Sequence, residues 1–180
     1  KYVSNKYAKS INKNYDDLNI IFCHVGNRNV SVAAHKNGKV VDVNQAYMGF
    51  GPMGFFETGT LPVSNVLDLL LKKHYTKDEM LKLLNKDATF SVYVGTNSYD
   101  KIIEMSKNNN KTKFILDVMA YQIAKEIASH YVTLDAKIDA VILSGKIFSN
   151  NRFFKYLSKR IENLAPVISY PKDYTFEALI

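Results

Sequence analysis

One stretch decides the fold, and it reads Asn19-Ile-Ile-Phe-Cys-His-Val-Gly26-Asn-Arg-Asn-Val-Ser31-Val-Ala-Ala-His-Lys-Asn37-Gly38-Lys-Val-Val-Asp42. Its apolar runs predict three strands, over residues 20–25, 30–35 and 39–43. The Asn37-Gly38 pair is a strong hairpin signal, because a tight primed turn requires positive φ at its central residues. The stretch therefore predicts an antiparallel meander of three strands.

The turn that follows Gly26 bears on function. Backbone N–H groups of a tight glycine-containing turn can converge on one point and hold a phosphate group. The same residues also suit an ordinary turn in a meander, and the stretch alone favours that simpler interpretation. Both interpretations stay open at this point.

Beyond Asp42 the chain alternates between loops, helices and strands. Residues 44–62 form a long glycine-rich loop, and its aromatic and methionine side chains indicate an ordered segment that packs on another surface. Thr76-Lys-Asp-Glu79 has the pattern of a capping box at the start of a helix. The continuous apolar run up to Leu143 predicts a strand that is covered on both faces of its sheet. The other predicted elements are helices over residues 2–11, Ser64 to about Lys73, 98–107, Thr112–Tyr131 and Ser149 or Asn150 to about Asn163, and strands over Phe90–Val94, 138–143 and 166–169.

Length and composition indicate one globular domain. The 180 residues can bury a sizeable core, 47% of them are hydrophobic, and no apolar run approaches the length of a membrane span. The single cysteine, Cys23, excludes an internal disulfide and fits a reducing cytoplasm. Because the sequence begins at Lys1 without the pattern of a signal peptide, we expect a fragment or a trimmed protein.

The formal net charge of +7 raises the question of a nucleic-acid partner. The lysines are scattered without a basic block, and no zinc pattern, basic zipper or RNA-binding motif accompanies them. We therefore expect no nucleic-acid partner and no membrane partner. A basic potential would favour an anionic nucleotide or an acyl phosphate.

Several short motifs occur in a fixed order along the chain. After the hairpin come Gly59-Thr-Leu-Pro-Val63, Val94-Gly-Thr-Asn97, Asp117-Val-Met-Ala-Tyr-Gln-Ile-Ala-Lys-Glu-Ile127, Ile142-Leu-Ser-Gly145 and Ala165-Pro-Val-Ile-Ser-Tyr-Pro171. In their order and spacing these motifs resemble the carboxylate kinases of the acetokinase family, and the butyrate kinases most closely. Lys1-Tyr-Val-Ser4 and Cys23-His24-Val-Gly26-Asn27 are more similar to the acetate kinases.

The resemblance covers nearly the whole chain but only the second half of such an enzyme. It implies an α/β fold of the ribonuclease-H-like, actin-like ATPase kind, with a mixed sheet flanked by helices. Residues 1–180 would form a single domain that corresponds to the C-terminal lobe, and the N-terminal lobe would be absent. The family reaction is reversible phosphoryl transfer between ATP and a short-chain carboxylate, with Mg²⁺.

The resemblance also implies a role for each matched position. His24 would contact the transferred phosphoryl group as the catalytic residue. The positions implied to bind the nucleotide are Gly26, Asn27, Arg28, Asn29, Gly95, Thr96, Asn97, Gly145, Lys146 and Ile147. The positions implied to face the substrate are Phe55, Glu57, Gly59 and Thr60. No metal ligands are assigned, because the remaining histidines have no partners at metal-ligand spacing.

Some positions depart from the family pattern. Asn27-Arg28-Asn29 replaces consecutive glycines, and these side chains hinder close approach of the backbone to a phosphate. Glu57 stands where the family places a catalytic arginine. Further departures fall at Ser98, Asp100, Lys146 and Thr175. Because the loss of one such group costs orders of magnitude in rate, we expect the isolated chain to be inactive.

Three functions stay open on these grounds. The first is the second lobe of a butyrate-kinase-like phosphotransferase that acts in the cytoplasm on ATP and a short-chain carboxylate. The second is a non-catalytic oligomerisation module that retains the fold. The third is another actin-like kinase of a small metabolite. For the first two we expect either a homodimer or pairing with the missing N-terminal lobe.

Overall fold

The computed structural model describes residues 1–87, 89–174 and 176–179. Contacts between Cα atoms group the chain into two compact units. The first unit contains Lys1–Gly26, Ser31–Asn44 and Ala120–Ile180, and the second contains Asn27–Val30 and Gln45–Met119. The expectation of a single domain stays a prediction.

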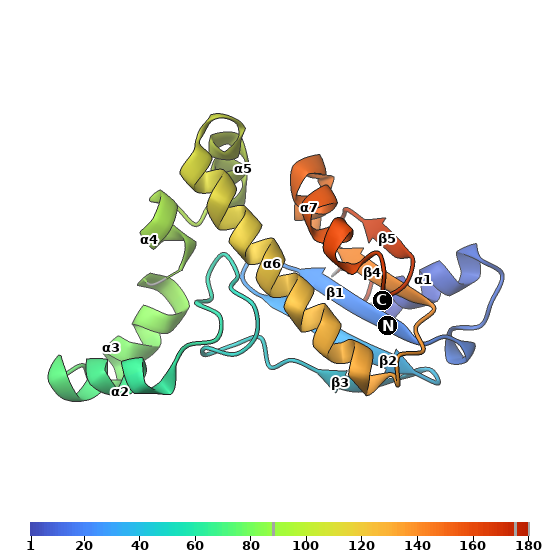
Figure 1. The fold of residues 1–180 in the computed structure, drawn as a ribbon, viewed down its shortest axis with the longest axis horizontal. Coiled ribbons are helices and arrows are strands. Elements are labelled where there is room, and N and C mark those ends of the chain that lie inside the picture. Colours follow the sequence, from blue (N-terminus) through green and yellow to red (C-terminus); the bar gives the residue numbers. More distant parts are fainter. Residues whose placement is uncertain (88, 175, 180) are drawn as a thin grey trace. The chain divides into compact units, whose positions relative to one another are not determined.

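A mixed sheet of five strands forms the centre of the first unit. Its strands lie in the order β3-β2-β1-β4-β5, with β2 antiparallel to β3 and with β4 parallel to both β1 and β5 (Figure 1). The strands are β1 (Ile20–Val25), β2 (Val30–Lys36), β3 (Lys39–Val43), β4 (Ala140–Ser144) and β5 (Val167–Tyr170). The predicted meander and both later strands are confirmed, and every residue of β4 is buried as its apolar run requires.

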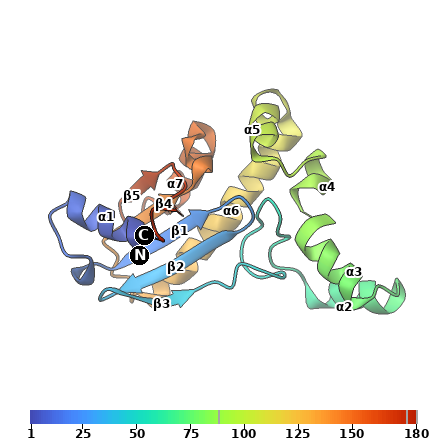
Figure 2. The same cartoon turned by 180° about the vertical axis from the view of Figure 1, so that it is seen from behind.

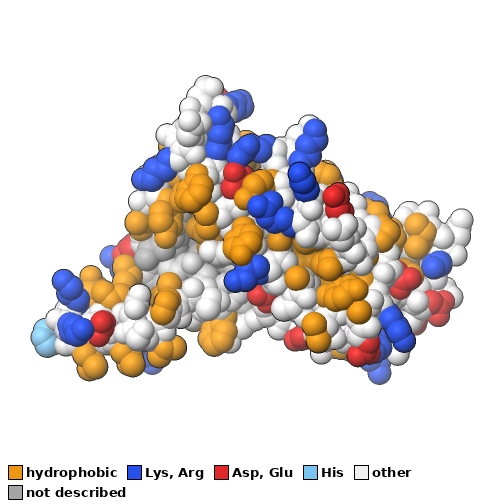
Figure 3. Space-filling view, in the orientation of Figure 1, with side chains coloured by type: hydrophobic (Ala, Val, Ile, Leu, Met, Phe, Trp, Pro, Cys, Tyr) orange, Lys and Arg blue, Asp and Glu red, His pale blue; other side chains and the backbone are white. Residues whose placement is uncertain are grey.

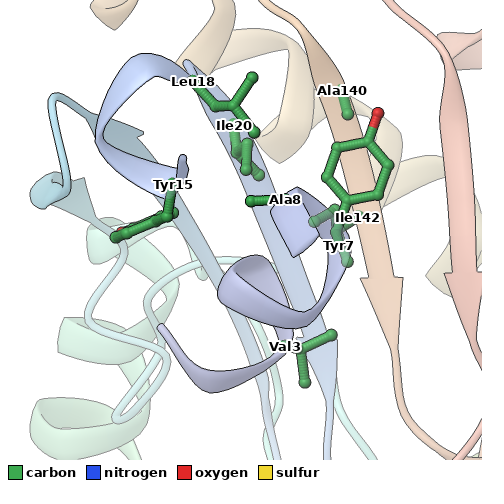
Figure 4. Close-up of a cluster of buried hydrophobic side chains, with 8 residues drawn as sticks. All are labelled: Val3, Tyr7, Ala8, Tyr15, Leu18, Ile20, Ala140 and Ile142. Carbon is green, nitrogen blue, oxygen red and sulfur yellow. The ribbon is translucent and has the colours of Figure 1, made fainter. Parts of the chain in front are cut away.

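Helices cover both faces of this sheet. Helix α1 (Tyr2–Ser10) lies on one face, and the part of α6 (Asn110–Thr133) that belongs to this unit crosses the other, as the front and rear views show (Figure 2). Helix α7 (Asn151–Ile161) connects β4 to β5. Beneath α1, the apolar side chains of Val3, Tyr7 and Ala8 pack on Ile20 and Ile142 (Figure 4). Tyr15, from the 3₁₀ turn η1 (Tyr15–Asp17), joins the same buried cluster.

Reciprocal hydrogen bonds fix the start of the β1–β4 ladder. The backbone N–H of Asn19 donates to the Asp139 carboxylate at 2.8 Å, and the N–H of Asp139 donates to the Asn19 carbonyl at 2.8 Å. The side-chain amide of Asn19 also donates to the carbonyl of Lys137 at 2.9 Å. These contacts set the register that pairs Ile20 with Ala140.

The second unit is mainly helical. It contains α2 (Val63–Lys72), α3 (Lys77–Lys82), the π-helical turn η2 (Leu83–Asp87), α4 (Phe90–Val94), α5 (Tyr99–Asn108) and the start of α6. The predicted capping box of Thr76 and Glu79 is present at the start of α3. Phe55 from the glycine-rich loop packs against Phe90 and Tyr99, with ring centroids 5.2 and 5.8 Å apart.

The prediction of a strand over Phe90–Val94 is wrong, because these residues form α4. Aromatic and β-branched side chains favour a strand locally, but the burial of Phe90 overrides that preference. The side-chain oxygen of Asn97 accepts the N–H of Ser91 at 2.7 Å, which satisfies a donor in the first turn of the helix. Gly95 then ends α4 in the left-handed conformation, with φ of 82°.

The predicted caps of two other helices have different outcomes. Helix α2 begins at Val63, after Pro62, and Ser64 lies inside the helix and does not cap it. At α7, Asn150 is the capping residue, since its side-chain oxygen accepts the N–H of Phe153 at 3.0 Å. Within the described residues, no helix combines the length and the apolarity that crossing a bilayer requires.

A buried histidine, His35, joins α1 to the sheet. Its Nδ1 lies 3.2 Å from the Ser4 hydroxyl and 3.0 Å from the Tyr15 hydroxyl, and its ring stacks on Phe22. An unprotonated Nδ1 carries one lone pair and accepts a hydrogen bond from one of these hydroxyl groups, whereas an imidazolium accepts from neither. Burial, followed by the positive charge of the amino terminus, lowers the pKa of His35 to about 4.

We predict that His35 makes folding sensitive to mild acid. The unfolded chain takes up a proton on this imidazole below about pH 6.5 and the folded chain only near pH 4, so stability falls between these values as the pH falls. Urea unfolding at about pH 7 and about pH 4.5 should show a loss of about 2 kcal/mol from this group. The difference should shrink by that amount in His35→Gln, which has no titratable side chain, and an equal loss in both proteins would contradict the assignment.

Candidate functional site

The carboxyl ends of the parallel strands carry the first group of predicted site residues. In the β1–β4 register, His24 lies beside Ser144, and Ser144 in turn lies beside Tyr170 of β5. The carboxyl end of a parallel sheet is the usual position of a ligand site in α/β folds. His24 is therefore placed where the sequence predicts a ligand contact.

His24 lines a hollow of about 350 Å³ in the first unit. The hydroxyl-bearing residues Ser31 and Ser144 line the same hollow, and Tyr2, Phe22 and Tyr174 supply aromatic walls. The two hydroxyl groups, and the imidazole when it is protonated, can donate hydrogen bonds to phosphate oxygens. The donor set of the hollow therefore fits a phosphoryl group.

The protonation of His24 reflects two opposing effects. Partial burial lowers its pKa below the ordinary value and is the larger effect. The Asp173 carboxylate and a hydrogen bond with the Ser144 backbone act in the opposite direction, because both favour the imidazolium. Near neutral pH the ring is thus mainly neutral, with one N–H donor and one acceptor.

Gly145 follows β4 and lies directly against β1. Its backbone has φ of 127°, and a Cβ at this position would come within 2.2 Å of the Val25 carbonyl oxygen. A side chain here would thus meet both a conformational and a steric barrier. Gly145 therefore packs directly on the Val25 backbone at the carboxyl end of the β1–β4 ladder, beside His24.

The two residues after Gly145 differ in exposure to solvent. Lys146 is exposed and Ile147 is buried, and both belong to the 3₁₀ turn η3 (Lys146–Ser149) that leads into α7. Within the first unit, the structure therefore brings His24, Gly26 and Gly145 to the carboxyl ends of adjoining strands. Their roles toward a nucleotide stay predictions.

The other predicted positions belong to the second unit. The carbonyl of Arg28 accepts the N–H of Phe56 at 2.9 Å, and the Arg28 guanidinium lies 5.4 Å from the centroid of the Phe56 ring. Gly54 approaches the same segment so closely that a Cβ would come within 2.5 Å of the Arg28 carbonyl oxygen. The turn that contains exposed Asn27 and half-buried Asn29 is thus joined to the glycine-rich loop.

Glu57 is an internal residue of this loop. Its side chain is 3% exposed, and its carboxylate accepts the N–H of Met48 at 3.3 Å. Burial raises the pKa of Glu57, while the hydrogen bond from Met48 and the nearby Arg28 charge partly offset the rise. Phe55 is also buried, at 2% exposed, so both side chains hold the loop together.

Hydrogen bonds within the glycine-rich loop join its C-terminal end to its middle. Thr60 donates to the carbonyl of Gly51 through its N–H at 2.9 Å and through its hydroxyl at 3.2 Å. Gly59 adopts φ of 78°, the left-handed region. Of the four positions predicted to face substrate, Thr60 is the exposed one.

Gly95, Thr96 and Asn97 have local structural roles. Gly95 ends α4, the Thr96 hydroxyl accepts the N–H of Ser98 at 3.1 Å, and Asn97 binds the start of α4. The Asn97 side-chain oxygen also accepts the hydroxyl of Thr89 at 3.1 Å. Contact of these residues with a nucleotide stays a prediction.

The described residues form no cluster of three histidine, cysteine or carboxylate side chains that could hold a metal ion. Cys23 is fully buried, and burial raises the pKa of its thiol. Thr175, one of the departures from the family pattern, lies outside the described residues.

Sequence reasoning missed three groups around His24. Ser31 and Ser144 sit inside apolar strands, and their proximity to His24 depends on the strand register, which the sequence does not give. Asp173 lies far along the chain in a segment without a repeating pattern. The Ile142-Leu-Ser-Gly145 motif, which stands out in the sequence, was the signal that could have drawn attention to Ser144.

Comparison with solved structures first defines the class of fold. The chain superposes on acetate kinase from Porphyromonas gingivalis, with TM-score 0.80 and 22% identity over 90% of this chain and 41% of that one. It superposes equally well on a propionate kinase from Francisella tularensis, with TM-score 0.80 and 21% identity over 93% of this chain and 50% of that one. The fold is thus that of the actin-like ATPases, as the sequence predicts.

The sequence comparisons then identify the family. The model of the acetokinase family matches residues 1–165, and the chain belongs to this family. It is 37% identical to butyrate kinase 2 of Clostridium acetobutylicum over 99% of this chain and 50% of that protein. It is 34% identical to a probable butyrate kinase of Bacteroides thetaiotaomicron over 99% of this chain and 51% of that protein. The chain therefore spans about half the length of these relatives.

We predict that Gly145 is far less replaceable than Gly95. Gly145→Ala should destabilise the fold by about 3 kcal/mol or more, because the Cβ meets the Val25 carbonyl in a backbone region open mainly to glycine. Gly95→Ala is the matched control, since that Cβ meets nothing within 4 Å and only the positive φ costs about 1 kcal/mol. Urea denaturation of both variants measures the difference, and equal losses would contradict the predicted close approach.

We also predict that Asp173 raises the pKa of His24 against the larger effect of burial. Asp173→Asn should lower the pKa of His24 further, because an anion that stabilises the imidazolium is lost. NMR titration of the His24 ring protons measures this change. Asp17→Asn, a neutralisation elsewhere on the same unit, should leave the His24 titration where it is, and a similar shift in both variants would indicate a non-specific effect of charge.

Proposed function

We propose that this chain forms the second half of a carboxylate kinase that transfers a phosphoryl group between ATP and a short-chain carboxylate, with butyrate as the leading substrate. The observation that carries the proposal is the alignment of 99% of the chain with one half of butyrate kinase 2. The position of His24 and Gly145 at the carboxyl ends of β1 and β4 supports it. The cytoplasm is the proposed location, since butyrate kinase is a metabolic enzyme and the chain has a lone buried thiol.

The hollow beside His24 is the proposed position of the phosphoryl group. ATP would supply that group, and phosphoryl transfer asks the protein mainly for positioning and charge stabilisation. His24 and the Ser144 and Ser31 hydroxyl groups would donate hydrogen bonds to its oxygens. The Ser144 backbone and Asp173 would orient the His24 ring and favour a proton on it as negative charge approaches.

The described residues do not fit a magnesium site held by the protein alone, because they bring together no group of three histidine, cysteine or carboxylate side chains that could hold a metal ion. Mg²⁺ is commonly held by one or two carboxylates together with the substrate phosphates.

The isolated chain should be catalytically inactive. It corresponds to about half of its relatives, so half of the residues of the homologous enzymes have no counterpart in it. Glu57, at a position where the family resemblance implies an arginine, is buried and accepts the Met48 N–H. Glu57→Arg would remove that acceptor and bury a guanidinium, so this change alone should not produce activity.

We predict no acyl-phosphate formation by the chain with Mg²⁺, ATP and butyrate in a hydroxamate assay. The reason is that the chain spans about half the length of its relatives and that several site positions are changed, and the no-enzyme blank is the reference. Steady turnover above the blank that disappears in His24→Ala would contradict the prediction of inactivity.

A titration with Mg-ATP separates the kinase lobe from the non-catalytic module. Saturable binding in the micromolar range, weakened in His24→Ala, would support the nucleotide site. No binding at all would favour a module that retains the fold for assembly alone. His74→Ala is the matched control, because it removes an exposed imidazole from the second unit.

Self-association is the proposed state of the free chain. Helix α2 buries none of its residues, and three apolar side chains four residues apart are exposed, with Val63 at 73%, Leu67 at 49% and Leu71 at 71%. An exposed apolar stripe of this kind favours an interface with a second copy, and closed two-fold dimers are the commonest outcome.

Light scattering at about 100 μM should therefore give the mass of a dimer, since weak interfaces have dissociation constants in this range. Leu67→Glu/Leu71→Glu should give a monomer, because the stripe then carries two charges. Val92→Glu/Tyr93→Glu is the control, since it places two charges on exposed side chains of α4. A clean monomer of the unmodified chain would contradict self-association.

A further inference from the structure

Helices α6 and α7 together present a basic surface in the first unit. Its cations are Lys125 of α6 and Lys155, Lys159 and Arg160 of α7, and all four are exposed. Figure 3 shows Lys and Arg side chains gathered over α7 and the neighbouring part of α6. We call this set the α6–α7 basic face. None of its residues lines the hollow beside His24.

Two tyrosines contact two of these cations, Arg160 and Lys125. The Arg160 guanidinium lies 3.7 Å from the centroid of the Tyr156 ring and 6.0 Å from that of Tyr121. Its Nη1 also donates to the Tyr156 carbonyl at 3.1 Å. On α6, the Lys125 ammonium lies 5.8 Å from the centroid of the same Tyr121 ring. Arg160 thus connects the two helices through aromatic rings, and two cations share one ring.

No ion pair neutralises these four cations among the residues that the structure describes. Lysines elsewhere on the chain do have such partners, for example Lys36 with Asp135 and Lys72 with Asp68, each at 3.0 Å. Exposed cations without an ion-pair partner are available to an anionic partner, and complementary charge across an interface favours association. The pattern therefore indicates a surface suited to a negatively charged partner.

The chemistry of the face discriminates between two kinds of polyanion. Single-stranded nucleic acids bind by stacking bases on bare aromatic rings, but the Arg160 guanidinium already occupies a face of Tyr156. Tyrosine and arginine are instead the residues that are enriched at the centres of protein interfaces. The planar guanidinium of Arg160 matches a carboxylate through two parallel hydrogen bonds.

We propose that the α6–α7 basic face is a docking surface for an acidic, carboxylate-rich segment of a partner protein. Arg160 and Tyr156 form its fixed centre, and Lys125, Lys155 and Lys159 supply charge around it. This site is independent of phosphoryl transfer, so a failure of the kinase proposal leaves it unaffected.

A labelled peptide of about ten glutamates is a suitable probe, with binding to the full chain measured by fluorescence anisotropy at low salt. The expected result is saturable binding that weakens as salt is added. Lys155→Glu/Lys159→Glu/Arg160→Glu should weaken it by about tenfold or more. Because these three side chains are exposed, the variant should fold, and a helical circular-dichroism spectrum with a cooperative melting transition checks this.

Lys9→Glu/Lys13→Glu/Lys39→Glu is the matched control. It changes the net charge by the same amount on exposed residues of the same unit, and binding should stay within about threefold of the unmodified chain. Equal weakening by both triple variants would overturn the proposal in favour of non-specific attraction to a basic protein.

Two other outcomes would also overturn it. Tighter binding of a uridine oligonucleotide of about the same length, lost in the α7 variant, would make the face a nucleic-acid site. Self-association of the unmodified chain that disappears in the α7 variant would make the face an interface between copies of this chain.

Discussion

The parallel pairing of β1 with β4 is the constraint on which the first unit depends. The two strands meet although their first residues are separated by 120 positions, and both ends of the ladder are fixed. Asn19 and Asp139 exchange hydrogen bonds at the amino end, and at the carboxyl end Gly145 lies against the Val25 carbonyl. A shift of one residue would turn every side chain of β1 to the opposite face, so these fixed ends determine that His24 lies beside Ser144. The candidate site is thus a consequence of strand register.

Local sequence patterns predicted the secondary-structure elements well where the patterns were strong. The Asn37-Gly38 turn has the positive φ of 51° and 71° that its sequence requires, and the buried run of β4 needed no context to be identified. The strand predicted over Phe90–Val94 failed because β-preferring side chains were placed in a helix by the burial of Phe90 and by the Asn97 side chain. The candidate site was harder to predict, because Ser31, Ser144 and Asp173 reach His24 through register and through a chain return that no short motif encodes.

Glu57 shows how burial changes the interpretation of a substituted position. From the sequence it would place an anion near a phosphoryl group. In the second unit the residue is 3% exposed and its carboxylate accepts the Met48 N–H, in a loop where Ala46 and Met48 adopt the unfavourable φ of 60° and 55°. Such backbone strain persists only where surrounding contacts over-determine it. The carboxylate therefore stabilises the loop conformation, and its effect on a bound anion is reduced by its raised pKa and by the Arg28 charge.

Folding also brings together positive charges that are dispersed along the sequence. Along the sequence the lysines are scattered, which argues against a basic segment, yet the helical spacing of Lys155 and Lys159 puts both on one side of α7. Arg160 lies on the flank of that helix and reaches Tyr121 of α6 across 6.0 Å. A sequence of dispersed charges thus becomes a continuous surface only when two helices pack. The packing of α6 and α7 therefore creates a surface that is separate from the hollow beside His24.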